Sequence, residues 1–540
     1  MIPFSAPVQD QLLTLRAVAG EAGLPGLDPD LVEQVLREGG RFAENVLAPL
    51  NPVGDREGVR LDNGVVRTAT GYAEAWRQFA DAGWLGLPFP EDSGGQGLPW
   101  TVATVLADSF NAASLTWYLA PLLTQAAIEA MLHHASDELK ERYLHDMVSG
   151  AATGAMCLTE PQAGSDLGAL RARAEPQADG SYKITGQKIY ITFGDHDFTK
   201  QVVHLVLARL PDAPAGSRGI SLFLVPKFLP DGSRNDWRVA GLEHKLGIHG
   251  SPTCVIAYGD SGGATGWLVG APHAGLKCMF TMMNNARLGV AVEGLGIAER
   301  ALQAADAYAA ERRQGRRGGE LVPIAAHPDV AATLTRIRAT TAAARGICYL
   351  TAFELDRGDQ ALTSLLTPIA KAWCTDRAVE LASDAVQVHG GMGFIEETGV
   401  AQLYRDARIL PIYEGTNGIQ AQDLVLRKLP LEDGKVAHRL FARIRARLPA
   451  LATGTELGLA LDQAEQATGH LLEAGADDQA AAAVAYLRLM GDLIGGWLLA
   501  ECAALSGGEH GRLARYWATR VLPLAGARLA EIRAGAEDIF

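Results

Sequence analysis

The chain has 540 residues, of which 48% are apolar and 20% are charged, values that are ordinary for a soluble globular protein. This composition excludes a wholly disordered or collagen-like chain, and at about 150 residues per domain the length predicts three or four domains. Acidic side chains outnumber basic ones by 62 to 48, which gives a net charge of −14 and disfavours non-specific binding of nucleic acid.

The six cysteines predict reduced, buried thiols, because none lies in a CxxC pair or at the spacing of a zinc site. Asp195, His196 and Asp197 are adjacent and cannot easily converge on one ion, so we predict no metal site. The sequence MIPFSAPVQDQ lacks the basic and apolar regions of a signal peptide. No run reaches about 18 uninterrupted apolar residues. These features predict a cytoplasmic protein with no integral membrane contact.

The first 150 residues are predicted to be helical, apart from a loop over 83–99 that is rich in Gly and Pro. Apolar residues recur at three- and four-residue spacing in four segments, which are 32–50, 73–82, 101–134 and 137–148. The pattern changes near residue 151 to short β-type runs separated by Gly, Pro, Asp and Asn. These runs cover 182–184, 188–192, 202–208, 220–225 and 253–258.

Long helical stretches rich in Ala and Leu return after residue 275, over 276–313, 328–357 and 361–389. A further helical segment fills 431–540 and is divided or kinked at Gly454, Gly475, 506–508 and Pro523. The chain order is therefore helical, then β, then helical, then a further helical region.

A tight loop at 156–166 (MCLTEPQAGSD) offers the hydroxyls of Thr159 and Ser165, and Gly164 allows backbone N–H groups to approach a ligand. On residue types alone, a capped turn with Asp166 near a helix start is the favoured interpretation. The segment 187–194 (QKIYITFG) predicts an alternating strand.

Tyr190 and Thr192 would share one face of that strand, since side chains two apart point the same way. An aromatic ring beside a hydroxyl suits a flat heterocycle. Taken in isolation, a half-buried strand is again the favoured interpretation.

Glu414 follows an apolar run and precedes a turn that contains Gly, in the segment 410–420 (LPIYEGTNGIQ). Burial there would raise the pKa of its carboxyl and make it a usable base near neutral pH. A helix-start acid or a surface glutamate remains open from this segment alone.

Three further segments could contact phosphates. They are the Gly-rich bend 387–393 (QVHGGMG), the polar residues Asn284, Asn285 and Arg287 in an apolar helix, and the basic cluster 311–317. A C-capping turn and a solvated charged face are the alternatives.

In this order and spacing, the segments resemble the acyl-CoA dehydrogenase flavoprotein family over about residues 30–430. The matching signatures are PEDSGGQG at 90–97, CLTEPQAGSD at 157–166, KIYIT at 188–192, QVHGGMGF at 387–394 and RDARILPIYEGTNGIQ at 405–420. The resemblance implies a multidomain α+β fold. Its parts would be an N-terminal α-helical domain (1–150), a central β-barrel or sandwich domain (151–275), a C-terminal four-helix domain (276–430) and an additional helical region (431–540).

The resemblance also implies FAD between the β domain and the C-terminal helices. Thr159 would hydrogen-bond the flavin ring, Tyr190 would lie against it where many members carry Trp, and Thr192 would sit near N5. Arg312 and the 387–391 loop would hold the phosphates and adenosine across a dimer contact. The implied cofactor-binding residues are Met156, Leu158, Thr159, Tyr190, Ile191, Thr192, Arg312, Gln387, His389, Gly390, Gly391, Thr416 and Gly418. Those implied for acyl-CoA are Ser165, Asn284, Arg287 and Gly415, with Asn284 standing where several members have Asp.

Glu414 matches the catalytic base of the family. Some members place the base on the helix just before the conserved arginine, but the matching position here is Ala286, which cannot act. The implied reaction removes the α-proton with Glu414 while a hydride leaves the β-carbon for flavin N5, giving a trans-2-enoyl-CoA. An electron-transferring flavoprotein is the implied electron acceptor, and a homodimer or dimer of dimers the implied assembly.

Among larger relatives, the sequence resembles the methylthiopropionyl-CoA dehydrogenase-like group, through 50–58, 204–216 and 245–254. The acyl chain is not fixed by this likeness, because apolar pockets discriminate poorly. An acyl-CoA oxidase is one alternative. A DNA-associated, alkylation-response flavoprotein is another, but it should carry a basic C-terminal region. Here 431–540 holds 11 basic and 14 acidic residues.

Overall fold

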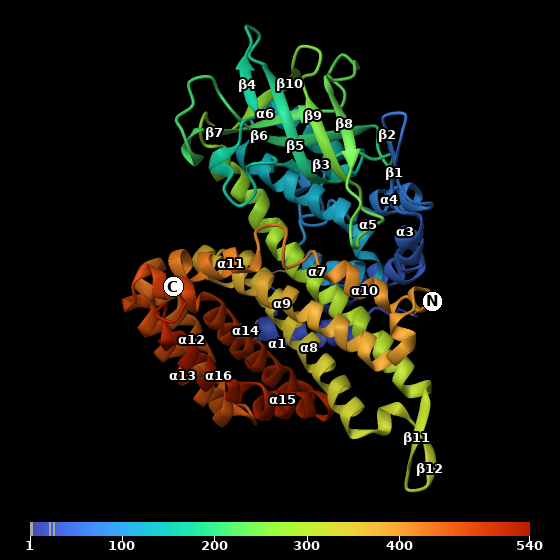
Figure 1. Cartoon of the computed structure of the whole chain (residues 1–540), viewed down its shortest axis with the longest axis vertical. Coiled ribbons are helices and arrows are strands. Elements are labelled where there is room, and N and C mark those ends of the chain that lie inside the picture. The colour runs from blue at the N-terminus through green and yellow to red at the C-terminus, as the bar shows by residue number, and fades with distance from the viewer. Residues whose placement is uncertain (1–3, 21–22, 25–26, 540) are drawn as a thin grey trace. The chain divides into compact units, whose positions relative to one another are not determined.

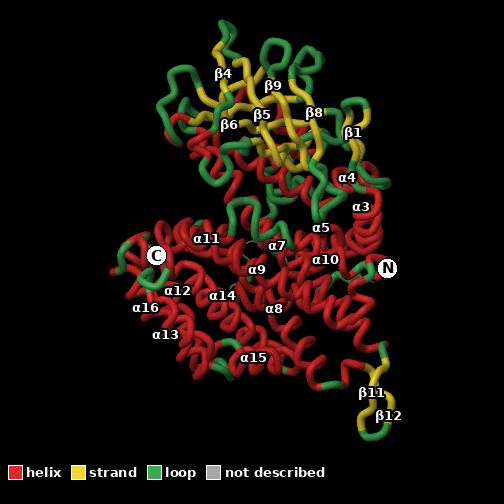
Figure 2. Tube along the Cα trace, in the orientation of Figure 1, coloured by secondary structure: helices red, strands yellow, loops and turns green. Residues whose placement is uncertain are grey.

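The computed structural model describes residues 4–20, 23–24 and 27–539. It divides into two compact units, each assembled from separate stretches of chain. Unit 1 comprises Met1–Asn45, Pro99–Ala113 and Arg287–Phe540, and unit 2 comprises Val46–Leu98 and Ser114–Ala286. Unit 1 is almost entirely helical, whereas unit 2 combines helices with a β-sheet (Figures 1 and 2). The four predicted domain ranges stay a prediction, because this division follows contacts instead of chain order.

The helices of the first 150 residues are α1 (Val8–Ala19), α2 (Pro29–Phe42), α3 (Asn51–Glu57), α4 (Tyr72–Asp81), α5 (Trp100–His134) and α6 (Asp137–Ser149). Helices α2, α4, α5 and α6 correspond to the four expected segments, whereas α1 and α3 lie outside them. Their starts show ordinary capping, since the Asp28 carboxylate accepts from the Asp30 N–H at α2 and the Ser136 hydroxyl accepts from the Leu139 N–H at α6. A π-helical turn, Ala43–Leu47, continues α2 and extends the helical structure into the second half of the predicted segment 32–50.

Unit 2 contains the predicted β domain. Its strands are β3 (Ala152–Cys157), β4 (Arg173–Pro176), β5 (Tyr182–Thr192), β6 (Gln201–Arg209), β7 (Ile220–Pro226), β8 (Trp237–Leu242), β9 (Thr253–Tyr258) and β10 (Ala264–Val269). The order is β10-β7-β6-β4-β5-β9-β8, with β3 parallel to β6. Since β10 also pairs with β5, the sheet closes on itself around a core that includes Val206, Phe223 and Ile256. A small hairpin, β1 (Arg60–Asp62) and β2 (Val65–Arg67), completes the unit.

Three long helices form the centre of unit 1, as the Ala/Leu-rich stretches predicted. They are α7 (Gly275–Glu311, whose first residues belong to unit 2), α8 (Pro328–Asp356) and α9 (Gln360–His389). The basic cluster 311–317 starts at the end of α7 and continues into the exposed hairpin of β11 (Arg313–Arg317) and β12 (Glu320–Pro323). Two short helices, α10 (Val400–Ala407) and α11 (Asn417–Asp423), follow α9 and flank the segment that carries Glu414.

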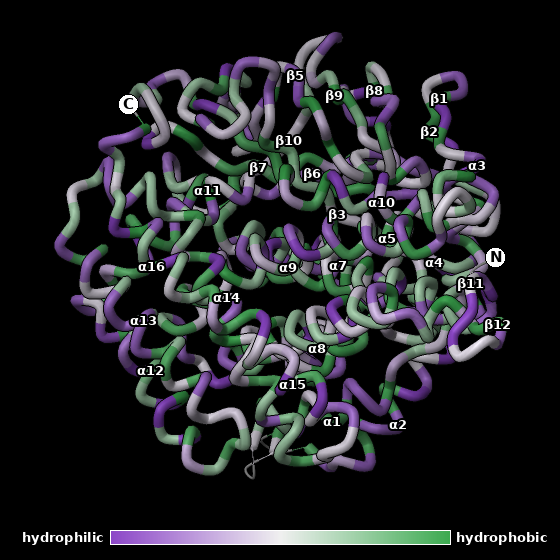
Figure 3. Tube along the Cα trace, turned by 60° about the horizontal axis from the view of Figure 1, so that its bottom comes forward, coloured by the Kyte–Doolittle hydropathy of each residue, from purple (hydrophilic) through white to green (hydrophobic). Residues whose placement is uncertain are grey.

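The C-terminal helical region also belongs to unit 1. Its helices are α12 (Lys435–Arg447), α13 (Gly454–Glu473), α14 (Ala476–Ser506), α15 (Gly508–Arg520) and α16 (Ala525–Ala534), and they break at the predicted Gly and Pro positions. Helices α12, α13 and α16 carry hydrophilic stretches along their traces (Figure 3). Within the described chain, α14 alone is long and apolar enough to cross a membrane, but 83% of its most apolar window is buried in the protein. That burial is typical of a core helix.

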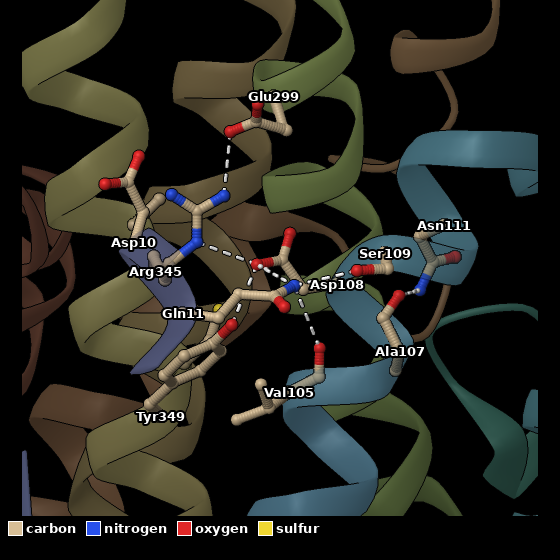
Figure 4. Close-up of polar contacts among 12 residues, drawn as sticks. Asp10, Gln11, Val105, Ala107, Asp108, Ser109, Asn111, Glu299, Arg345 and Tyr349 are labelled. Carbon is tan, nitrogen blue, oxygen red and sulfur yellow. Dashed lines mark hydrogen bonds and ion pairs between the residues drawn. The ribbon is translucent and has the colours of Figure 1, made fainter. Parts of the chain in front are cut away.

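A buried ion-pair network joins α5, α7 and α8 inside unit 1, and the Gln11 amide of α1 also donates to Asp108 (Figure 4). The Arg345 guanidinium donates to Asp108 Oδ2 at 2.7 Å and to Glu299 Oε2 at 2.8 Å. The Tyr349 hydroxyl also donates to Asp108 Oδ2, at 2.8 Å. Because the charges are paired and hydrogen-bonded away from water, this network has the character of a structural core cluster.

Candidate active site

The backbone around Glu414 adopts an unusual conformation. Glu414 has a φ of +55° and Gly415 a φ of +85°, so two consecutive residues lie in the left-handed region. For a residue with a Cβ this costs about 1–3 kcal/mol and persists only where neighbouring groups hold it. Here they do. The Glu414 carbonyl accepts from Gln420 Nε2 at 3.1 Å and Arg287 Nε at 3.4 Å. Strain of this kind concentrates at functional sites.

Helix α9 anchors the same turn from the other side. The Lys371 ammonium donates to the Gly415 carbonyl and to Asn417 Oδ1, both at 2.9 Å. The Asn417 amide donates in turn to Thr375 Oγ1 at 2.9 Å and to Asp376 Oδ1 at 2.7 Å. The turn that carries Glu414 is therefore bonded to two long helices, α7 and α9, and its carboxyl has a defined place.

The charges around Glu414 suit a base. Desolvation raises the pKa of its carboxyl above the usual value, and the cations Arg287 and Lys371 oppose that rise. Lys371 is fully buried, and burial lowers its pKa to about 7 although the Glu414 carboxylate works against this. Among the residues that the structure describes, the Glu414 N–H has no acceptor. A carboxyl of raised pKa thus lies beside a free backbone donor.

In unit 2, a buried ion pair supports the loop at 156–166. The Lys188 ammonium donates to Glu160 Oε1 and to the Leu158 carbonyl, both at 2.8 Å. Burial would raise the pKa of Glu160, but Lys188 and the N–H groups of Arg171 and Ala172 outweigh it and keep the carboxylate ionised. The Ile189 N–H donates to the Thr159 carbonyl at 2.9 Å. These bonds join the loop to β5.

Strand β5 differs from the predicted regular alternation. Its pairing with β9 shifts register between Lys188 and Ile191, and Tyr190 within that bulge has a φ of +60°. The bulge interrupts the two-residue period before Ile191, so the shared face of Tyr190 and Thr192 stays a prediction. Tyr190 is 61% exposed, an unusual position for a large aromatic side chain.

The donor set of this region fits a flavin. The Thr159 and Thr192 hydroxyls have no partner within the part of unit 2 that the structure describes, and Ile191 beside them is buried. Two free hydroxyls and an exposed ring can satisfy the polar edge and the flat face of a heterocycle. Met156 and Leu158 are buried at the end of β3.

The remaining predicted residues fall into two groups. Arg312, Gln387, Gly390, Gly391, Gly418, Ser165 and Asn284 are exposed or lie in open turns, so ligand contact is sterically possible. His389 and Thr416 already have structural partners. The His389 ring stacks on Tyr308 with centroids 4.3 Å apart and donates from Nδ1 to the Ala385 carbonyl, and the Thr416 hydroxyl caps α11.

The acidic-histidine run near residue 196 has separate partners. Asp195 accepts from Lys227, His196 bonds the Thr153 hydroxyl, and Asp197 accepts from Thr68. In the described ranges, no cluster of three or more His, Cys, Asp or Glu side chains is arranged to hold a metal.

Thus Glu414, Gly415 and Arg287 come together in unit 1, and Thr159, Tyr190 and Thr192 lie along one loop and strand of unit 2. Sequence analysis missed Lys371, Asn417 and Gln420, which hold the Glu414 turn, and the Glu160–Lys188 pair. The NG dipeptide after the turn was the only local signal for Asn417.

Family models cover most of the chain. The N-terminal, middle and C-terminal domains of acyl-CoA dehydrogenases match residues 32–151, 155–261 and 273–429. A model described as acetyl-CoA dehydrogenase C-terminal like matches 439–540, so the additional helical region has relatives of its own.

Relatives align along nearly the whole length. The 3-methylmercaptopropionyl-CoA dehydrogenase of Ruegeria pomeroyi is 44% identical, over 94% of this chain and 93% of that protein. A broad-specificity linear acyl-CoA dehydrogenase of Mycobacterium tuberculosis is 32% identical, over 94% and 91%. The crystal structure of Caenorhabditis elegans ACDH-11 with C11-CoA has a TM-score of 0.82 at 21% identity, covering 96% of this chain and 91% of that one, which supports the fold. The chain therefore belongs to the acyl-CoA dehydrogenase family and is an oxidoreductase that acts on acyl-CoA.

Proposed function

We propose that this protein catalyses FAD-dependent α,β-dehydrogenation of an acyl-CoA thioester to the trans-2-enoyl-CoA, with Glu414 as the α-proton base. The observation that carries the proposal is the Glu414 carboxyl, held at a left-handed turn beside Arg287 and Lys371 with its pKa raised by burial. FAD, when bound, supplies a hydride acceptor at N5.

The polypeptide has two tasks at the substrate. Glu414 must take the α-proton, and a donor must stabilise the negative charge that develops on the thioester oxygen. The free Glu414 N–H is the donor that we assign to that oxygen. Arg287, Gly415, Ser165 and Asn284 are the residues that we propose for acyl-CoA contact. A base and an oxyanion donor on one residue keep both groups in register during proton transfer.

For FAD, we propose that Thr159 and Thr192 bond the flavin edge and that Tyr190 covers a face. The free hydroxyls and the exposed ring support this assignment. The other residues proposed for the cofactor are Met156, Leu158, Ile191, Arg312, Gln387, His389, Gly390, Gly391, Thr416 and Gly418. The His389 side chain would contact the cofactor by packing instead of through Nδ1, because its ring stacks on Tyr308 and that nitrogen is bonded to the Ala385 carbonyl.

We further propose a soluble, cytoplasmic homodimer, or dimer of dimers, that passes electrons to an electron-transferring flavoprotein. The family relationship supports this partner, and the exposed Arg312 beside the β11–β12 hairpin supports a phosphate contact supplied to a second copy. Light scattering showing a monomer with full FAD occupancy would contradict the assembly.

Anaerobic mixing of the FAD-loaded protein with acyl-CoA tests the reaction through bleaching of flavin absorbance. Glu414→Gln should retain FAD but bleach about 10²–10⁴-fold more slowly, the usual value of a general base. Glu354→Gln is the matched control, since Glu354 is a buried glutamate on α8 that pairs with Arg443. Near-native bleaching in Glu414→Gln would reject the assignment.

The same assay addresses the substrate and the electron acceptor. A series of linear acyl-CoAs and a methylthio-substituted propionyl-CoA should be compared first, because proteins similar to this chain are named for such substrates. Admitting O2 after bleaching separates dehydrogenase from oxidase. Slow return of the flavin absorbance in O2 supports a dehydrogenase, whereas fast return with each turnover supports an oxidase.

A further inference from the structure

A second buried acid lies beside the proposed base. Glu293, on α7, is fully buried, and its Oε2 accepts a hydrogen bond from the hydroxyl of Tyr413, the residue directly before Glu414. Its other carboxyl oxygen, Oε1, is buried and has no partner among the described residues. Since buried polar atoms are nearly always bonded, an unpartnered carboxyl oxygen next to the catalytic turn requires an explanation.

Charged groups from several elements surround this acid. Glu414 lies in the turn, Lys371 projects from α9, and Tyr413 donates to Glu293 and is influenced by the charge of Asp406 of α10. Lys371 is in turn influenced by Asp376 of α9 and Arg287 of α7. The Glu414 carboxylate raises the cost of ionising Glu293, because two nearby carboxylates repel.

Burial raises the pKa of Glu293 to about 8, although the Tyr413 hydrogen bond and Lys371 oppose the rise. A carboxyl with a pKa near 8 is mainly protonated at pH 7, and the unpartnered Oε1 of Glu293 can carry that proton. Glu414, which has two cations beside it, is then the member of the pair that ionises.

We propose that Glu293 is a positioning residue that orients the Tyr413–Glu414 turn and restricts the site to one negative charge while Glu414 accepts the α-proton. This inference rests on the proposed role of Glu414. When Glu293 also ionises, at alkaline pH, a second carboxylate opposes the negative charge that develops on the thioester oxygen. The rate of flavin bleaching should then fall.

The test is the pH dependence of single-turnover bleaching in Glu293→Ala, Glu293→Gln and Tyr413→Phe. Glu293→Ala should lower the rate at pH 7 by up to about 10²-fold, because the turn loses its anchor. Glu293→Gln keeps the acceptor for Tyr413 without the charge. It should rescue most of that loss. It should also move the fall of the bleaching rate at high pH, the alkaline limb, to higher pH by about one unit. Tyr413→Phe should lower the rate with little change in substrate affinity.

Two controls separate this role from a structural one. Lys371 also titrates in this range. The measured quantity is therefore the shift of the alkaline limb between the original protein and Glu293→Gln, instead of the position of the limb in one protein. Glu354→Gln, which removes another buried carboxylate, should leave the limb in place. Tyr486→Phe matches Tyr413→Phe, since Tyr486 is a buried tyrosine bonded to Thr468.

Overlapping pH profiles for the original protein and Glu293→Gln would overturn the inference, as would equal losses in the Ala and Gln variants. If Glu293→Ala fails to fold or to hold FAD, the pH profile of Glu293→Gln alone decides. Normal bleaching by Glu414→Gln would instead reject the proposed base. If Glu414→Gln does not bleach and the Glu293 variants bleach like the original protein, only the role of Glu293 is rejected.

Discussion

Lys371 is a buried amine that donates its hydrogen bonds to the turn after Glu414. Its ammonium donates to the Gly415 carbonyl and Asn417 Oδ1, and it is one of two cations beside Glu414. A buried ammonium is costly unless it is paired and hydrogen-bonded, so these contacts account for its position in an otherwise apolar stretch of α9. It links the geometry of the turn to the ionisation of the base.

Replacing this amine with an apolar chain of similar length separates its two roles, which are to hold the turn and to influence the ionisation of Glu414. Lys371→Met should lower the bleaching rate at pH 7 by about 10²-fold, because the turn loses two bonds. The loss of a cation raises the pKa of Glu414, and the base must be ionised to act, so the acid limb of the rate should move to higher pH. Lys435→Met, at an exposed position, is the control. An unshifted acid limb would show that Lys371 does not influence the base.

Glu414 could be found from sequence because its turn is marked by Gly415, Asn417 and Gly418. Lys371 and Glu293 could not, since each is a single polar residue in an apolar helix, where a surface position is the default expectation. Their partners lie 44 and 120 positions away along the chain. Only the folded arrangement of α7, α9 and the turn reveals these contacts.

Two buried histidines hold the end of β5 in unit 2. His204 donates from Nε2 to the Gly194 carbonyl at 2.6 Å and accepts at Nδ1 from the Tyr258 hydroxyl at 2.8 Å. His196 bonds Thr153 at 2.7 Å and accepts the Phe198 N–H. Both rings are therefore neutral in the folded protein. Burial lowers the pKa of each to about 3.

The sign of the pH effect follows from these depressed pKa values. The unfolded chain takes up protons near pH 6.5 while the folded rings stay neutral, so stability is complete above that pH and is lost as pH falls toward 3. As the pH falls from 7 to 5, each histidine should lower the free energy of unfolding by about 2 kcal/mol. Urea unfolding across this range should show a smaller dependence on pH in His196→Gln. An identical dependence in that variant would contradict the prediction.

Sequence patterning found β6 and β7 because their apolar residues form nearly continuous buried runs, and β9 because its Val, Ile and Tyr favour strands. It missed β3, which is built from small residues (ATGAMC), and β4, a four-residue polar strand that ends in Pro. Strands β8 and β10 contain internal Gly, which weakens the local β signal. It divided β5 at Gly186. Closure of the sheet depends on these weaker strands, so it could not be predicted from the sequence.

The C-terminal helices are part of the same compact unit as the helices around Glu414. Trp373, two residues after Lys371 on α9, donates from Nε1 to Asp492 Oδ1 of α14 at 2.9 Å. Its indole lies directly against Gly491, where an added Cβ would come within 2.2 Å of the ring. Gly346 of α8 meets Leu498 of α14 in a similar close approach. The region therefore packs on α8 and α9 through glycine positions that leave little room for a Cβ.

If residues 431–540 are integral to unit 1, a single methyl group added at Gly491 should lower the stability of the whole unit. Gly491→Ala should destabilise the protein by about 1–3 kcal/mol, the usual cost of overpacking a core. Gly469→Ala, in α13 with open space around its Cα, should instead be neutral or stabilise by about 0.5–1 kcal/mol, because alanine favours helix. Calorimetry provides the measurement. One transition that includes FAD release and moves to lower temperature in Gly491→Ala would support integral packing, whereas movement of a separate transition alone would show that residues 431–540 fold independently.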